Sequence, residues 1–353
     1  MQERSLYQKY RPSSFGDVLG QDHIVGVLKG ALKEKKPAHA YLFVGSRGTG
    51  KTSVARILAK ELGATDSDIH EIDAATYTGV DNIRALREEA AVMPFESEKK
   101  VYIVDEVHML SKGAFNAFLK LLEEPPSHVA FILATTELEK VPETIQSRCQ
   151  VFTFKKPTQK VLMEMVTRVA KAEGFTLEPA SAEIISLLAD GSFRDAHGIL
   201  QKILSSSPDK KVSVEEVVAV TGAPKLELVH RAIEGLAKGD AKVALKAVGE
   251  AAKANADMGV FAMLLMQRLR IILMLRYAPE FGKELEADLT DADQKQLESL
   301  SADAASKLNS ETLRKIILAS IETSRSPVPE LPLELAIMEL SGENAPGKGT
   351  NSK

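Results

Sequence analysis

Gly45-Ser46-Arg47-Gly48-Thr49-Gly50-Lys51-Thr52 matches the pattern G-x-x-x-x-G-K-[ST] without a mismatch. The apolar run 40–44 precedes it and predicts a buried strand, and apolar residues at helical spacing follow it over 52–62. A strand, a glycine-rich turn and the start of a helix form an anion site, because free backbone N–H groups and the helix dipole are directed to the same point. The stretch therefore predicts a phosphate-binding loop within an α/β fold.

Each position of this loop has a chemical purpose. Its three glycines permit backbone angles and a close approach that a Cβ atom would block. Lys51 is expected to contact the β- and γ-phosphates of ATP, and the Thr52 hydroxyl is expected to bind Mg²⁺. The predicted nucleotide-binding residues of the loop are Gly45, Ser46, Arg47, Gly48, Thr49, Gly50, Lys51, Thr52 and Ser53.

Two carboxylates follow a second apolar run, 101–104. Ligands of a parallel sheet bind at the carboxyl ends of its strands, so Asp105 would share the Mg²⁺ with Thr52. Glu106 would then act as the general base that polarises the attacking water. An Asp-Glu pair after a strand is, taken alone, more often a solvated turn, and it is the matching phosphate loop that favours the catalytic interpretation.

A third strand is predicted to end at Thr135-Thr136. The Thr136 hydroxyl could hold the attacking water or sense the γ-phosphate, although threonine at a strand end is also explained by β propensity alone.

The apolar patterns predict an α/β domain with a parallel five-stranded sheet, followed by helices only. Pro157 and the Gly-Ala-Pro run 222–224 are candidate boundaries. We therefore expect an amino-terminal domain over 1–156, a small helical lid over 157–222, a helical domain over 223–341 and a disordered tail over 342–353. Strands are predicted near 40–44, 69–73, 101–105, 129–135 and 150–154, and helices near 51–62, 80–92, 111–123, 158–173, 180–189, 193–205, 213–220, 224–237, 241–254, 257–277, 291–307, 309–324 and 329–341.

This order of motifs resembles the AAA+ clamp-loader ATPases, and most closely the bacterial DNA polymerase III gamma/tau family. Asp105 to Ser111, DEVHMLS, is the most specific run, and the resemblance is dense from about Leu6 to Ala196 and weaker beyond Thr221. The other matching segments are YRP at 10–12, VLGQ at 18–21, HAYLF at 39–43, IDAA at 72–75, FNAFLK at 115–120, LEEPP at 122–126, ATTE at 134–137 and SRC at 147–149.

The resemblance implies an ATP- and Mg²⁺-dependent motor whose last helical domain is an oligomerisation collar. Its implied partners are delta- and delta-prime-type subunits, further gamma/tau copies, the sliding clamp and primer-template DNA. ATP binding would open the clamp and hydrolysis would release it on DNA, without polymerisation by this subunit. Two rivals stay open: a scaffold that binds ATP without hydrolysis, and another AAA+ motor that remodels DNA.

The resemblance also assigns two arginines. Arg148 would be an arginine finger that completes the ATP site of an adjacent subunit, and Arg194 would reach the γ-phosphate within its own subunit. Ser192 is placed to cap a helix with Arg194 in its first turn, where a cation opposes the helix dipole and an anion is therefore expected nearby. The alternatives are a surface arginine at 194 and a local ion pair at 148.

The resemblance further suggests an adenine pocket at Arg11, Pro12 and Val18, with loop packing as the alternative. Thr78, Arg84 and Lys112 are candidates for contacts to the DNA backbone, with ordinary solvated residues as the alternative.

One departure from the family concerns zinc. The family usually carries a four-cysteine module before the Ile-Asp-Ala-Ala segment, but here only 62–69 stand in that place, and the chain has 1 cysteine, Cys149. No four-ligand zinc site can be built from cysteine, so no zinc is expected.

Composition limits the remaining classes. A net charge of −4 is unlike that of a protein that coats DNA. The amino terminus lacks the pattern of a signal peptide, and we expect no membrane span because charged residues interrupt the most apolar segment, 260–275. A single cysteine fits a reducing cytoplasm, and Cys149 is expected to be a packed small residue.

Overall fold

The computed structural model describes residues 5–207, 209–286, 289 and 291–342. It divides into two compact units, the first of 1–162 with 189–198 and the second of 163–188 with 199–353. The expected three-domain division stays a prediction. The expected tail, apart from Gly342, lies outside the described residues.

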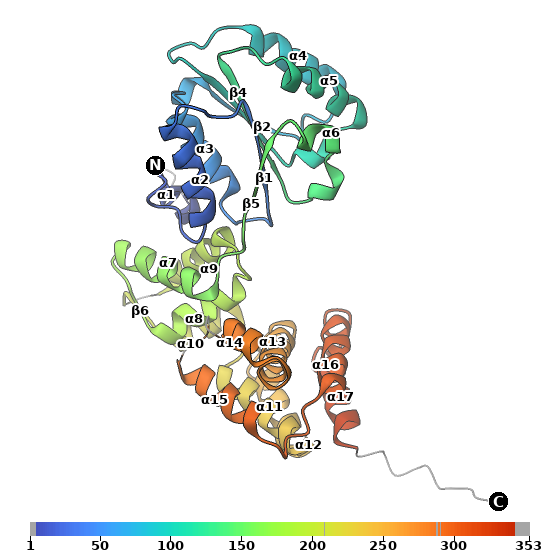
Figure 1. The fold of residues 1–353 in the computed structure, drawn as a ribbon. Helices are drawn as coiled ribbons and strands as arrows, with labels where there is room; N and C mark the ends of the chain where they lie inside the picture. Colours follow the sequence, from blue (N-terminus) through green and yellow to red (C-terminus); the bar gives the residue numbers. More distant parts are fainter. Residues whose placement is uncertain (1–4, 208, 287–288, 290, 343–353) are drawn as a thin grey trace, which may run out of the picture. The chain divides into compact units, whose positions relative to one another are not determined.

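The first unit is built on a five-stranded parallel sheet, most of whose strands are labelled in Figure 1. The strand order is β2-β3-β4-β1-β5. Its strands are β1 (Ala40–Val44), β2 (Ile69–Asp73), β3 (Lys100–Asp105), β4 (Val129–Thr135) and β5 (Gln150–Thr153). The predicted α/β class and strand positions are confirmed. The inner strands β1, β3 and β4 are almost fully buried apolar runs, whereas the edge strands β2 and β5 are partly exposed.

Side chains of β1 alternate between two hydrophobic cores, as the period of a strand requires. Leu42 packs with α4 (Val80–Ala91) and α5 (Lys112–Glu123) on one face. Phe43 packs with α2 (Asp22–Lys33) and α3 (Lys51–Glu61) on the other. The sheet is thus covered on both faces, and its carboxyl edge is left to the loops. The shorter helical elements of this unit are α1 (Leu6–Lys9), η1 (Asp66–Asp68), η2 (Val107–Met109), η3 (Leu138–Lys140) and α6 (Glu143–Gln146).

The remaining elements are helical apart from one pair of short strands. β6 (Thr176–Leu177) and β7 (Lys211–Val212) pair in parallel, so the expectation that strands end after residue 156 is wrong. Two-residue strands leave no periodic pattern in a sequence. The helices are α7 (Gln159–Ala172), α8 (Pro179–Leu188), α9 (Phe193–Ser206), α10 (Val214–Thr221), α11 (Leu226–Lys238), α12 (Ala241–Lys253), α13 (Met258–Tyr277), α14 (Pro279–Glu286), α15 (Asp291–Ala302), α16 (Ser310–Thr323) and α17 (Leu331–Ser341).

The long helix α13 forms the centre of the second unit's core. It has 20 residues and, by length and composition alone, is the one described helix that could cross a membrane. Phe261, Leu265 and Ile272 are fully buried in the core among other helices. Arg268 is also buried and pairs with Asp293, so α13 behaves as the core helix of a bundle.

Candidate active site

The phosphate loop joins β1 to α3, and its glycines are sterically required. A Cβ atom at Gly45 would lie 2.8 Å from the Phe154 side chain, and one at Gly48 would lie 2.0 Å from the Ser192 hydroxyl. Gly50 is left-handed, with φ of 98°, and starts α3. The Gly48 carbonyl accepts a hydrogen bond from Phe193 N–H at 2.9 Å, which fixes the loop against the start of α9.

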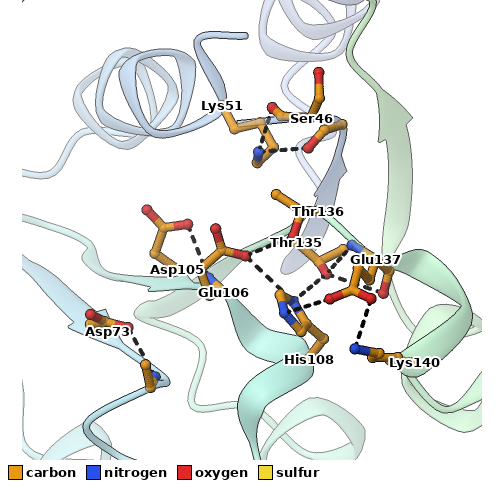
Figure 2. A network of polar contacts seen from close by, with 12 residues as sticks. Ser46, Lys51, Asp73, Asp105, Glu106, His108, Thr135, Thr136, Glu137 and Lys140 are labelled. Carbon is orange, nitrogen blue, oxygen red and sulfur yellow. Dashed lines mark hydrogen bonds and ion pairs between the residues drawn. The ribbon is translucent and has the colours of Figure 1, made fainter. Parts of the chain in front are cut away.

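Lys51 lies inside this loop. Its Nζ donates to the carbonyl oxygens of Gly45 at 2.7 Å and Ser46 at 3.0 Å (Figure 2). Burial lowers the pKa of Lys51, while the charges of Glu106 and Asp105 act in the opposite direction. The ammonium is thus held inside the loop, and its burial favours an anionic partner.

Thr52 and Asp105 meet at the carboxyl edge of the sheet. The Thr52 hydroxyl donates to Asp105 Oδ2 at 3.0 Å. Among the residues the structure describes, no group of three or more His, Cys, Asp or Glu side chains could hold a metal ion alone. This pair suits Mg²⁺, which takes one or two protein oxygens and completes its shell with phosphate oxygens and water.

Glu106 follows in a strained backbone conformation. Its φ of 48° and ψ of 45° are left-handed, a geometry that costs a non-glycine residue about 1–3 kcal/mol and is concentrated at functional sites. Its N–H donates to Asp105 Oδ1 at 3.0 Å, and its Oε2 accepts from the Thr136 hydroxyl at 3.2 Å. The structure therefore brings together five of the predicted catalytic and metal-binding residues, Lys51, Thr52, Asp105, Glu106 and Thr136.

His108 belongs to this site although the sequence had not suggested a role for it. Its ring is 7% exposed and lies between Glu106 and Glu137, with Thr135 beside it (Figure 2). Glu137 in turn pairs with Lys140 at 2.7 Å. The sequence signal is only the position of His108 after the Asp-Glu pair, since the contacts depend on β3 and β4 being neighbours.

The predicted in-subunit arginine lies next to the loop. Ser192 caps α9 by accepting from Asp195 N–H at 3.2 Å, so Arg194 is in the first turn as predicted. Its guanidinium is exposed and stacks 5.1 Å from the centre of the Tyr7 ring. Burial lowers the pKa of Arg11, and the charges of Arg56 and Arg194 contribute to the same shift. Arg11, Arg56 and Arg194 therefore lie close enough to one another to interact, and Glu71 opposes their effect on the pKa of Arg11.

Pro12 and Val18, the other two residues of the expected adenine pocket, are half-buried. Val18 packs against the core cluster that contains α2 and α3, as the alternative of loop packing implies. The contact of Arg11, Pro12 and Val18 with a nucleotide stays a prediction.

Arg148 is the predicted site residue that the structure leaves apart from the loop. Its guanidinium donates to Glu123 Oε1 at 2.7 Å and to the Thr144 carbonyl at 2.8 Å. The local ion pair considered for this residue is therefore present, but a surface pair of this kind is worth only about 0–1 kcal/mol. The role of Arg148 in the site of an adjacent subunit stays a prediction.

The candidate DNA contacts lie at two neighbouring helix starts. The Thr78 carbonyl accepts from Ser111 N–H at 3.2 Å, which joins the beginning of α4 to that of α5. Thr78, Arg84 and Lys112 are all exposed. Two helix N-termini side by side favour anionic ligands such as DNA phosphates. The contact of these three residues with DNA stays a prediction.

Comparisons with known proteins agree with this geometry. A family model described as "DNA polymerase III, delta subunit" matches residues 63–158. The gamma subunit of DNA polymerase III from Buchnera aphidicola is 31% identical over 361 residues, which cover 96% of this chain and 98% of that protein. The tau subunit from Bacillus subtilis is 41% identical over 307 residues, which cover 81% of this chain and 54% of that protein.

The chain belongs to the DNA polymerase III gamma/tau family. It spans about half the length of the tau relatives it matches, with 54% of the Bacillus subtilis protein and 48% of the Escherichia coli protein covered. Among solved structures, the RuvB Holliday junction branch migration motor of Thermotoga maritima has a TM-score of 0.52 at 19% identity, covering 81% of this chain and 91% of that one. That likeness concerns the fold alone, and this gamma/tau chain has the AAA+ fold.

Proposed function

We propose that this gamma/tau chain is the ATP-hydrolysing subunit of a bacterial clamp loader in the cytoplasm. The observation that carries the proposal is the convergence of Lys51, Thr52, Asp105, Glu106 and Thr136 at one edge of the sheet. Each has the chemical character that its role requires, and the family relationship supplies the replication context.

The proposed mechanism assigns each step to a residue. The loop N–H groups and Lys51 bind the β- and γ-phosphates of ATP, and Thr52 with Asp105 would hold Mg²⁺, which neutralises phosphate charge when bound. Thr136 and Glu106 orient the attacking water, and Glu106 accepts its proton. Arg194 adds positive charge from the same subunit and Arg148 adds it to the site of a neighbour.

We further propose that ATP binding assembles this chain with delta- and delta-prime-type subunits into a spiral that opens the sliding clamp on primer-template DNA. Apolar side chains exposed on α16 and α17 support an oligomerisation role for the carboxyl-terminal helices. They are Ile317, Leu318, Ile321, Leu331, Leu335 and Met338.

Reconstitution tests this function. The chain, delta-type subunits and a labelled sliding clamp are mixed with primed DNA, and clamp transfer is followed by fluorescence. ATP should support loading by the wild type and not by Lys51→Ala. Loading that proceeds equally with Lys51→Ala would contradict the proposal. Loading by the wild type without ATP hydrolysis by this chain would favour a scaffold role, and branch migration without loading would favour a remodelling motor.

A further inference from the structure

His108 is held on both edges of its ring at the back of the catalytic site. Its Nδ1 lies 2.9 Å from Thr135 Oγ1 and 3.4 Å from Glu106 Oε2. Its Nε2 lies 3.3 Å from Glu137 Oε1 (Figure 2). The ring therefore bridges the end of β3, which carries Glu106, and the end of β4, which carries the other two partners.

The surrounding hydrogen bonds indicate which nitrogen donates. The Thr135 hydroxyl donates to the Glu137 carbonyl oxygen at 3.2 Å and accepts a hydrogen bond from the Glu137 N–H at 3.0 Å. A hydroxyl has one proton and two lone pairs. The proton of Thr135 is donated to the Glu137 carbonyl oxygen and one lone pair accepts from Glu137 N–H, so the second lone pair is left for His108 Nδ1. An N–H at Nδ1 satisfies these contacts together: it donates to the Thr135 hydroxyl and lies beside the Glu106 carboxylate. Nε2 faces the Glu137 carboxylate, and that contact is favourable only with a second N–H at Nε2.

Glu137 fixes the opposite edge of the ring. A hydrogen bond from Lys140, with the charges of Lys140 and His108, outweighs burial and lowers the pKa of Glu137. Glu137 is therefore a carboxylate, and its Oε1 is the partner of an Nε2–H on the ring edge opposite Glu106. A base oriented by a third group is the usual arrangement of acid–base sites.

We propose that His108 is a positioning residue for the general base Glu106, an inference that rests on the proposed ATPase function. Both side-chain contacts described for the Glu106 carboxylate, from Thr136 and from His108, go to Oε2. Oε1 is thereby directed to the attacking water. His108 acts through Glu106 and does not itself contact the reacting atoms.

The test uses the full chain assembled with its partner subunits. His108→Ala should lower kcat for ATP hydrolysis roughly tenfold to a hundredfold, less than the loss of a complete general base, which is about 10²–10⁴. KM and ATP affinity should change less than about twofold, because the phosphate loop is untouched. An unchanged kcat would overturn the proposal.

Two polar variants separate positioning from packing. The amide nitrogen of His108→Asn occupies the place of Nδ1, whereas that of His108→Gln lies nearer Nε2. Positioning predicts that Asn retains most of the hydrolysis and that Gln is as slow as Ala, with similar melting temperatures. Equal losses in Asn and Gln that follow the melting temperature would mean that His108 only fills space.

Combination with Glu106→Gln gives the final control. Because His108 acts through Glu106, His108→Ala should add no further loss to single-turnover hydrolysis in that background. An additive loss would contradict the proposal. If the wild type hydrolyses no ATP, the proposed function itself fails and the inference falls with it, whereas active wild type with an indifferent His108 overturns the inference alone.

Discussion

The Arg148 guanidinium donates to the Glu123 carboxylate at 2.7 Å, within one chain and away from that chain's own phosphate loop. The two side chains are 35% and 48% exposed, so solvent screens the pair and its breakage costs little stability. If removal of Arg148 lowers activity strongly, the loss cannot come from breaking the pair with Glu123. It must come from a contact that Arg148 makes elsewhere.

We predict that Arg148→Ala leaves nucleotide affinity nearly unchanged but lowers hydrolysis in the assembled complex. An arginine finger is worth about 10³–10⁵ in rate in GTPases, and a smaller effect is expected here because Arg194 already supplies charge within the subunit. Glu123→Gln is the matched control: it breaks the same ion pair and should keep hydrolysis. Equal losses in the two variants would mean that the pair is structural.

Mixing experiments test whether Arg148 acts on a neighbour. Chains with Arg148→Ala and chains with Lys51→Ala should each be inactive alone. Mixed complexes should recover part of the activity wherever an intact Arg148 faces an intact loop. No recovery at any ratio, in complexes shown to be assembled, would rule out action between subunits.

Lys51→Ala should abolish ATP binding, measured with a fluorescent nucleotide, because the phosphates lose a cation that the fold holds inside the loop. Lys60 is the matched control on the same helix, since it is exposed and pairs with Asp66 at 2.8 Å. Lys60→Ala should bind ATP normally. Retained binding by Lys51→Ala would remove this lysine from the site.

The purified protein should contain no stoichiometric zinc and should tolerate chelators, since the chain has 1 cysteine and residues 62–68 form only a short connection from α3 to β2. Elemental analysis checks this. One tightly held zinc ion per chain would contradict it.

Asp68 supports a prediction about stability. Burial works to raise the pKa of its carboxyl, but hydrogen bonds from the N–H groups of 95–97 and from the Ser97 hydroxyl hold that pKa well below its usual range. Asp68→Asn should lower the free energy of unfolding by about 1–3 kcal/mol at neutral pH, because it replaces a carboxylate acceptor facing several donors.

The pH dependence follows from the lowered pKa. Asp68 contributes its full stabilisation above the unfolded pKa of about 3.9 and loses it as the pH falls through the folded value, so the difference between wild type and variant should shrink in acid. Asp66→Asn, at a carboxylate 83% exposed, should change stability little at any pH. If the difference in free energy of unfolding between wild type and Asp68→Asn does not change with pH, the charge of the Asp68 carboxylate does not contribute to stability.

Local patterns predicted most of this fold. The buried strands and the helix predicted over 111–123 depend on residues close in sequence. The Ser111 hydroxyl caps that helix by accepting from Ala114 N–H at 3.2 Å. The helix α14 is not among the predicted helices. It begins at Pro279, and proline, which interrupts a helix from within, is well suited to the first position. The His108 contacts were missed because they arise from strand neighbours distant in sequence.

Glu106→Gln tests the central claim most directly. ATP binding and ATP hydrolysis are measured in the assembled complex, with clamp and primed DNA, for the wild type and for this variant. The account predicts normal binding and loss of hydrolysis, because only the proton acceptor for water is removed while Lys51, Thr52 and Asp105 are intact. Hydrolysis at the wild-type rate would contradict the assignment of this site as the catalytic centre.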